Sequence, residues 1–508
     1  MCGVADSSAT GETPNSATGT PVAPLTGGVE PLYARVGAAL DRFLTEDRPD
    51  PATRRAEWVA ALERPLPDEG IGADATLDEL LEVVVPNGSR VSDPGFWGWI
   101  VTGPATVPAA AAAAALIAAP HRYSIIASNL VEDLSLRWLA DLCGLGPHMR
   151  GIYSSGGSTA NLVALGAARQ WAFEQRGIDV AKDGVGGVRT AVYASAEVHH
   201  TIQRSAGVLG MGRSQVRMVP VDHGLRMRPD ALAELIGRDV ADGVLPVAVV
   251  GTAGTTNTGA IDPLRAVGEI AHAHGAWFHV DGAYGLPGSL DERVRPLYDG
   301  LELADSAIVD PHKWLGVPVG TGATFVRDRE LLRRAFTQEP ADYLAPQENS
   351  GADAVTSLDS MGVPYADLGV ELTAPARGIP VWSVMRELGR EGVAARIRQD
   401  NDFARRVADE VRAHPRLELL TEPTLSILCF RYVPPAEAGL DEAAVDAINA
   451  ELVHRLHIAT PYVPSTTKVH GRLAIRPCFV NSRTTDATLD GFTDTVVAFG
   501  DSLAATSA

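Results

Sequence analysis

The feature that most limits the fold of this chain is an alternation of short apolar runs with helical stretches between residues 189 and 326. Several segments between these runs, such as Pro229–Ile236 and Pro263–His274, have the spacing of apolar residues expected for helices. Such alternation is typical of a mostly parallel sheet covered by helices, so we predict an α/β fold. The candidate strands are Arg189–Ser195, Val216–Val219, Pro246–Thr252, Trp277–Asp281, Ala307–Asp310 and Gly322–Val326.

The segments on either side of this region have different patterns. The amino end is rich in Ser, Thr, Gly, Ala and Pro, which is typical of a disordered tail. Beyond about residue 380, a β-like run at Leu425–Tyr432 and a helical pattern at Glu442–Leu456 indicate a second domain. The predicted parts are a disordered tail (1–28), an N-terminal helical segment (29–95), a large α/β domain (96–380) and a small C-terminal α+β domain (381–508).

The charge balance argues against nucleic-acid and anionic-membrane partners. The chain has 43 Lys and Arg residues against 63 Asp and Glu residues, a formal net charge of −20. No run rich in Lys or Arg offsets this charge locally. We therefore expect neither nucleic acid nor an anionic membrane as a partner.

No segment of the sequence is long enough to cross a bilayer as an apolar helix. The most apolar stretch, Ala109–Ala119, is about half of the ~20 residues that a membrane span needs, so we predict a buried helix there. The first basic residue is Arg35, so the amino end lacks the pattern of a signal peptide. The four cysteines are far apart and lack metal-ligand spacing. We expect no metal site and a cytoplasmic location.

The lysine content restricts where imine chemistry can occur. Only Lys182, Lys313 and Lys468 are lysines, and an arginine cannot form a Schiff base. Lys182 and Lys468 lie in polar surroundings rich in Gly, Ser or Thr, as expected for surface residues. Lys313 follows a predicted strand and precedes Trp and Leu, so its amine is expected to be partly desolvated and nucleophilic.

Two further motifs could bind other parts of a cofactor that reacts with this lysine. The stretch that ends at Leu162 reads GIYSSGGSTANL, a strand, a Ser/Gly turn and a helix that begins near Ser158. Exposed N–H groups at such a helix start can hold a phosphate, although a tight turn capped by Ser158 is the alternative. Asp281 ends a predicted central strand, where open α/β sheets bind ligands. It could pair with a protonated pyridine nitrogen, or it could cap the next turn.

A pair of histidines, His199 and His200, follows the predicted strand that ends at Ser195. An imidazole at this position could stack on an aromatic cofactor and act on a proton near the substrate. The spacing does not decide which of the two points inward.

Taken in order, these stretches resemble the pyridoxal-phosphate group II decarboxylases, which include aromatic-L-amino-acid, tyrosine and glutamate decarboxylases. The segments HVDGAYG (279–285) and DPHKWL (310–315) are the most specific parts, and PGFWGW (94–99) resembles the family's aromatic segment near the substrate. The resemblance implies an aspartate-aminotransferase-type fold, pyridoxal 5'-phosphate (PLP) as cofactor, and a homodimer with active sites at the interface. It also implies decarboxylation of an L-amino acid to an amine.

The resemblance also implies roles for individual residues. Lys313 corresponds to the imine lysine, Asp281 to the partner of the ring nitrogen and His199 to the residue stacked on the ring. The family's loop tyrosine, which protonates the substrate carbon, is matched best by Tyr365, with Tyr343 as the alternative. The remaining cofactor contacts are Thr252 and Ala283 at the ring, and Gly157, Ser158 and His312 near the phosphate.

The sequence leaves the substrate and the exact reaction open. Phe96, Trp97 and Trp99 favour an aromatic substrate, whereas Arg377 and Arg476 could accept an acidic side chain. The same constellation also supports aldehyde-forming oxidative decarboxylation, transamination or C–S and C–C bond cleavage. The chain also departs from the animal aromatic enzymes, with Asp310 in place of Asn, Gly282 in place of Ala, and Trp99-Ile100-Val101 in place of Tyr-Phe-Pro.

Overall fold

The structure is a computed structural model, and it describes residues 28–46, 50–118, 126–337, 363 and 365–507. The chain divides into two compact units, residues 1–88 and 89–508. The first unit is helical, and Arg35 on its first helix forms an ion pair with Asp74 on its third, with 2.7 Å between Nη1 and Oδ1. Its helices are α1 (Val29–Thr45), α2 (Arg55–Leu62) and α3 (Ala73–Glu79), the last continued by a π-helical turn at Leu80–Val84.

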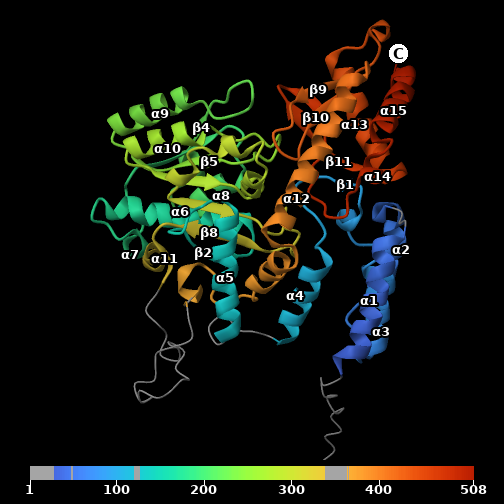
Figure 1. Ribbon diagram of the computed structural model, residues 1–508, viewed down its shortest axis with the longest axis horizontal. Helices are drawn as coiled ribbons and strands as arrows, with labels where there is room; N and C mark the ends of the chain where they lie inside the picture. Colours follow the sequence, from blue (N-terminus) through green and yellow to red (C-terminus); the bar gives the residue numbers. More distant parts are fainter. Residues whose placement is uncertain (1–27, 47–49, 119–125, 338–362, 364, 508) are drawn as a thin grey trace, which may run out of the picture. The chain divides into compact units, whose positions relative to one another are not determined.

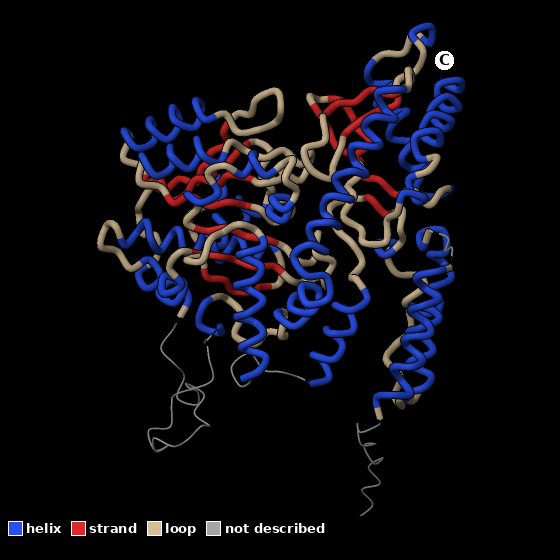
Figure 2. Tube along the Cα trace, in the orientation of Figure 1, coloured by secondary structure: helices blue, strands red, loops and turns tan. Residues whose placement is uncertain are grey.

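The second unit contains a seven-stranded sheet with the strand order β2-β8-β7-β6-β5-β3-β4 (Figures 1 and 2). Strands β3 to β7 pair in parallel, whereas β8 is antiparallel to both of its neighbours. The predicted α/β fold with a mostly parallel sheet is therefore confirmed. The strands are β2 (Arg150–Ser154), β3 (Thr190–Ser195), β4 (Val216–Val219), β5 (Leu245–Thr252), β6 (Trp277–Asp281), β7 (Ser306–Val309) and β8 (Gly322–Val326).

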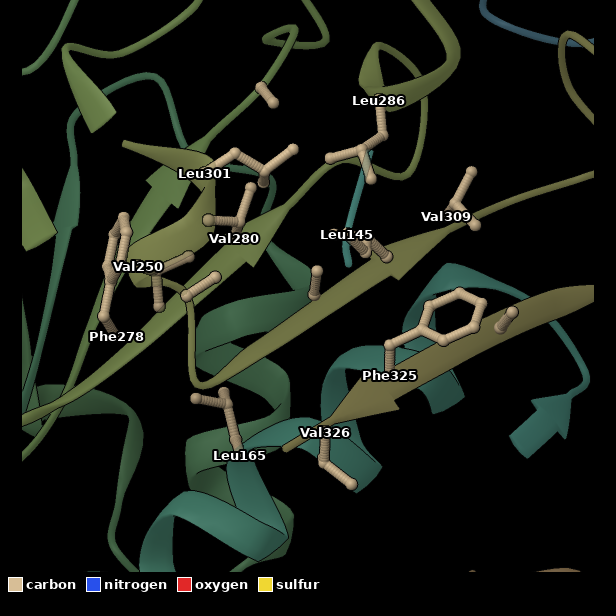
Figure 3. Close-up of a cluster of buried hydrophobic side chains, with 14 of the residues drawn as sticks. Leu145, Leu165, Val250, Phe278, Val280, Leu286, Leu301, Val309, Phe325 and Val326 are labelled. Atoms are coloured by element: carbon tan, nitrogen blue, oxygen red, sulfur yellow. The ribbon is translucent and has the colours of Figure 1, made fainter. Parts of the chain in front are cut away.

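Helices cover both faces of this sheet, which explains its apolar sequence. All eight residues of β5 are buried, because a parallel strand between two helical layers has no solvent-facing side. Figure 1 shows α9 and α10 on one face and α6 on the other, and Figure 3 shows core side chains such as Val250, Phe278 and Phe325. The helices of this region are α6 (Gly157–Glu174), α7 (Val180–Asp183), α8 (Thr201–Val208), α9 (Pro229–Ala241), α10 (Leu264–Ala273) and α11 (Arg329–Phe336).

A smaller, five-stranded sheet has the order β1-β11-β12-β10-β9. Strand β1 comes from residues 96–97, yet it pairs in parallel with β11, far along the chain. Helix α12 (Gly378–Ala413) runs across position 380, where the sequence placed a domain boundary. The four domain limits stay a prediction. The elements are β1 (Phe96–Trp97), β9 (Leu417–Thr421), β10 (Cys429–Tyr432), β11 (Val463–Val469), β12 (Arg472–Arg476), α13 (Glu442–Ala459), α14 (Asp486–Leu489) and α15 (Phe492–Ser507).

The apolar stretch near residue 110 forms a helix, α4 (Thr106–Ala118), followed by α5 (Ile126–Leu142). The prediction that this helix is buried is wrong for the single chain. Pro108 is its only buried residue, and Leu116 and Ile117 are 69% and 57% exposed. Its apolar composition marks a surface that the described part of the same chain does not cover. No helix in the described ranges has both the length and the apolar character that crossing a membrane requires.

Candidate active site

A cavity of about 520 Å³ lies at the carboxyl ends of the central parallel strands. Strands β5 and β6 end there at Thr252 and Asp281, and the turn between β2 and α6 also reaches the cavity. Ligands of open α/β sheets bind at this edge, because the loops that leave the strands diverge there. The cavity brings together all eight residues predicted to contact the cofactor, namely Gly157, Ser158, His199, Thr252, Asp281, Ala283, His312 and Lys313.

The glycine turn that leads into α6 depends on close backbone packing. Gly156 has φ +129°, a conformation that side chains strongly disfavour. A Cβ atom on Gly157 would lie 2.7 Å from Oδ2 of Asp310, so the second glycine is required by a carboxylate packed against it. Helix α6 begins at Gly157, and the first N–H groups of a helix have no partner within it. The turn therefore offers free donors to an anion in the cavity.

Asp281 is buried and receives two hydrogen bonds that hold its carboxylate in place. The side-chain Nδ2 of Asn161 donates to Oδ2 at 3.0 Å, and the backbone N–H of Ala283 donates to Oδ1 at 3.1 Å. Because Asn161 lies four residues after Gly157, one helical turn places it on the same side of α6 as the phosphate turn. Asn161 was not singled out from the sequence, although this spacing could have indicated it.

The orientation of the Asn161 amide is set by a hydrogen-bond chain behind Asp281. Burial lowers the pKa of His279 to about 4, so its imidazole is neutral at pH 7. Its Nε2 lies 2.9 Å from Oδ1 of Asn161 and its Nδ1 lies 2.9 Å from Oγ of Ser306. The amide oxygen can only accept, so Nε2 carries the proton and Nδ1 accepts from the Ser306 hydroxyl. This chain directs the Asn161 NH₂ group toward Asp281.

Thr252 contributes a polar atom that is free to contact a ligand. Its Oγ1 is buried and has no hydrogen-bond partner among the described residues, which is rare for a buried hydroxyl. Its backbone N–H donates to Oδ2 of Asp262 at 2.8 Å. Burial raises the pKa of Asp262 to about 6, and the carboxylate is held by this bond and by the N–H of Met227. The buried Asp262 thus anchors the end of β5.

Lys313 projects into the cavity with only a fifth of its side chain exposed. Its Nζ lies 3.1 Å from Oδ2 of Asp310. Lys182 and Lys468 are both exposed, as the sequence predicts. Lys313 is therefore the lysine that can react within this cavity.

The structure distinguishes the two adjacent histidines. His199 lines the cavity and its Nδ1 lies 2.9 Å from Oγ1 of Thr201, whereas His200 is exposed and does not line it. Burial lowers the pKa of His199, which favours the neutral ring. His312, near the glycine turn, donates from Nδ1 to the carbonyl oxygen of Thr321 at 2.6 Å. That bond leaves its Nε2 for other contacts.

Tyr365 is not part of this site. It does not line the cavity, and its side chain is 1% exposed, in a 3-10 turn at Tyr365–Leu368. Its hydroxyl donates to Oδ1 of Asp133 at 3.2 Å, and Arg329 lies over its ring. In the single chain this hydroxyl is therefore directed at Asp133 and away from the cavity, and the assignment of Tyr365 as proton donor stays a prediction. The alternative, Tyr343, lies outside the described residues.

A second cavity of about 560 Å³ shares His199, Thr256 and Lys313 with the first. Its wall includes the apolar side chains of Ile100 and Val453. Trp99 also lines it, with φ +52° and 66% exposure. The two cavities therefore adjoin at Lys313.

The two arginines considered from the sequence have different environments. Arg377 pairs with Glu371, with 2.7 Å between Nη1 and Oε2, so its charge is already compensated. Arg476 lines the second cavity, is 3% exposed and forms no ion pair within the described ranges. It donates instead to uncharged oxygens, which are the carbonyls of Trp99, Thr256 and Asn257 and the hydroxyl of Ser465. Of the two arginines, only Arg476 has no carboxylate partner among the described residues.

Comparison with known proteins places the chain in a family. Residues 116–433 match the family model described as the pyridoxal-dependent decarboxylase conserved domain. The chain is 31% identical over 359 residues to an aromatic-L-amino-acid decarboxylase of Bacillus atrophaeus, covering 70% of each chain. It is 33% identical over 427 residues to an L-2,4-diaminobutyrate decarboxylase of Rhizobium meliloti (strain 1021), covering 83% of this chain and 81% of the relative.

A solved structure supports the same assignment. The crystal structure of Oryza sativa TDC with PLP and tryptamine superposes with a TM-score of 0.82 at 26% identity, covering 94% of this chain and 98% of that one. The family model and these relatives show that the chain belongs to the pyridoxal-dependent decarboxylases, which act on amino acids.

Proposed function

We propose that this protein converts an aromatic L-amino acid to the corresponding amine and carbon dioxide. The observation that carries the choice of substrate is the second cavity, where Trp99, Ile100 and Val453 form an apolar wall beside Lys313. A flat apolar side chain gains most from such a wall. The relatives named above act, by their names, on an aromatic amino acid and on 2,4-diaminobutyrate, so the family alone does not define the substrate.

The residues of the first cavity fit pyridoxal phosphate. The helix start at Gly157 and Ser158 suits the phosphate, and the unpaired Oγ1 of Thr252 suits a polar atom of the ring. The carboxylate of Asp281 could pair with the pyridine nitrogen, and the amine of Lys313 could react with the aldehyde. When bound, the cofactor supplies an electron sink for the pair left by departing carbon dioxide.

The protein's own contribution is to position these groups and to control protons. Asp281, held by Asn161 and Ala283, would favour a proton on a ring nitrogen bound beside it. His199, which lines the same cavity, would contact the cofactor ring. Lys313 would supply the amine that holds the cofactor when no substrate is bound. These roles are proposals that rest on the shared cavity.

An acidic substrate is the second candidate, because Arg476 is a buried cation beside the same cavity with no ion-pair partner among the described residues. Such a cation favours a carboxylate nearby. The carboxylate could belong to the side chain of the substrate, or it could be the α-carboxylate that every amino acid carries.

Screening the common amino acids for amine formation tests the proposal. We expect kcat/KM for an aromatic amino acid to exceed that of any acidic or aliphatic one by roughly tenfold or more, since apolar pockets discriminate to that extent. Trp99→Ala should lower the aromatic value selectively, and Arg476→Gln should not change the ranking. A best substrate with an acidic side chain, whose advantage Arg476→Gln removes, would contradict the proposal. Measuring ammonia and peroxide together separates simple from oxidative decarboxylation.

We also infer that a second copy of the chain covers the exposed part of α4 and α5. Leu116 and Ile117 on α4 and Leu130 on α5 are each more than half exposed, and large exposed apolar side chains on a surface helix are typical of an interface. The resemblance to the decarboxylases implies a homodimer with active sites at the interface, which supports a copy of the same chain as the occupant.

The double substitution Leu116→Asp with Ile117→Asp should convert the dimer to a monomer, because two carboxylates would be buried without partners. Sedimentation velocity measures this change, and activity should fall along with the dimer. The control is Val240→Asp, which places one such charge on an exposed position of α9. A double variant that sediments like the wild type would refute this interface.

A further inference from the structure

Asp310 is a buried carboxylate that the decarboxylase chemistry does not use directly. It ends the segment after β7, three residues before Lys313, and its side chain is 3% exposed. Its Oδ2 lies 3.1 Å from Nζ of Lys313. Within the described residues, Lys313 forms no ion pair with Asp281, the other carboxylate of the cavity.

The backbone holds this pair in place from both sides. The N–H of Asp310 donates to the carbonyl of Ala283 at 3.0 Å, and the N–H of Lys313 donates to the carbonyl of Asp310 at 3.0 Å. A Cβ atom on Gly157 or Gly322 would lie within 2.8 Å of an Asp310 carboxylate oxygen. The carboxylate therefore cannot turn away from the lysine without displacing two backbone segments.

The environment of Asp310 makes Lys313 its main charge partner. Oδ1 is buried with no hydrogen-bond partner in the described part of the chain, so the charge is balanced mainly through Oδ2. The nearest other base is His312, whose Nε2 lies 3.9 Å from Oδ2, and its Nδ1 is occupied by Thr321. A buried charge is costly unless it is paired, and the nearby Nζ of Lys313 provides this pairing for Asp310.

We propose that Asp310 is a positioning residue that holds Lys313 as an ammonium whenever its amine is not bonded to the cofactor, and so competes with the cofactor aldehyde for that amine. This inference rests on the proposed role of Lys313. Imine formation makes a bond between Nζ and the aldehyde carbon, and the aldehyde oxygen leaves as water. Nζ must first lose a proton to solvent, and Asp310 opposes that loss. The same pair gives the lysine a defined resting place when a substrate amine has displaced it.

A different role would follow from the contact between Asp310 and the glycine turn. The carboxylate packs against Gly157, where the phosphate is expected, so it could act by repelling that phosphate. The two roles make different predictions for an aldehyde that has no phosphate, and pyridoxal itself is such an aldehyde.

The first test follows imine absorbance in cofactor-free Asp310→Asn protein mixed with pyridoxal phosphate or with pyridoxal. Asn keeps the size of the side chain and removes its charge. We expect imine formation to accelerate by roughly tenfold with both aldehydes, the effect of losing one charge-assisted hydrogen bond. Acceleration with pyridoxal phosphate alone would show that Asp310 acts by repelling the phosphate, which would overturn the proposal. No acceleration with either aldehyde would also overturn it. The control is Asp242→Asn, the same change at an exposed position.

The second test needs no cofactor, so it stands apart from the proposed function. Trace acetylation of the cofactor-free protein, read by mass spectrometry, reports the reactivity of each lysine, and the chain has only three. In Asp310→Asn, acetylation of Lys313 should rise by roughly tenfold while Lys182 and Lys468 serve as internal references. An unchanged ratio would overturn the proposal. Loss of imine in Lys313→Ala tests the proposed function separately.

Discussion

Lys313→Ala is expected to abolish the visible absorbance of the lysine-bound cofactor and to lower the rate of amine formation by roughly a thousandfold or more. Lys313 is the only lysine of the three that lines the cavity. Without its amine the cofactor can bind only through non-covalent contacts, and product cannot be released by exchange with the lysine. Absorbance spectra of the reconstituted protein and an amine assay measure the two effects.

The matched controls are Lys182→Ala and Lys468→Ala, which remove exposed lysines. Both should retain the absorbance band and the activity, because neither side chain reaches the cavity. Thermal unfolding of each variant is needed as well, since Lys313→Ala leaves the buried carboxylate of Asp310 without its partner. A Lys313→Ala protein that keeps the band would remove this residue from its proposed role.

Asp281→Asn is expected to lower kcat by roughly a hundredfold or more while the absorbance band persists. The amide keeps the shape of the carboxylate but lacks the charge that holds a proton on the ring nitrogen. The electron sink is weakened, whereas the reaction of Lys313 with the aldehyde is not directly affected. Steady-state kinetics should therefore show a loss mainly in kcat and a smaller change in KM.

Asp242→Asn, at an exposed position, controls for the chemical change itself. Thermal unfolding controls for the hydrogen bonds from Asn161 and Ala283, because the NH₂ group of Asn would replace one of the two accepting oxygens and face a donor. If kcat of the Asp281→Asn enzyme stayed within a few-fold of wild type, this carboxylate would not be the partner of the ring nitrogen.

The hydrogen bonds that link Ser306, His279 and Asn161 behind Asp281 show how the fold supports the site. Ser306, His279 and Asn161 come from β7, β6 and α6, and they are linked by hydrogen bonds of 2.9 Å. Since burial lowers the pKa of His279 to about 4, its imidazole stays neutral and keeps one tautomer through the neutral pH range. The carboxylate of Asp281 is thus held by the sheet and by a helix at once, which suits a group whose position must not change during the reaction.

Much of this protein could be predicted from its sequence, because local patterns record burial and backbone geometry. The run Leu245–Thr252 is apolar up to its last residue because helices cover both faces of its sheet, and the prediction of a mostly parallel sheet followed from such runs. The glycine turn was visible because close packing there excludes a side chain. Lys313 could be chosen because only three lysines exist and two have polar surroundings.

Only the tertiary structure decided which side chains meet. His199 and His200 are equivalent in spacing, yet one lines the cavity and the other faces solvent. Tyr365 matched a sequence position but is buried against Asp133, and Arg377 is neutralised by Glu371. Helix α4 is apolar yet largely exposed, because an apolar composition does not say whether residues of the same chain pack against it. Sequence patterns are local, whereas pairing, charge compensation and access to a cavity depend on residues far apart in the chain.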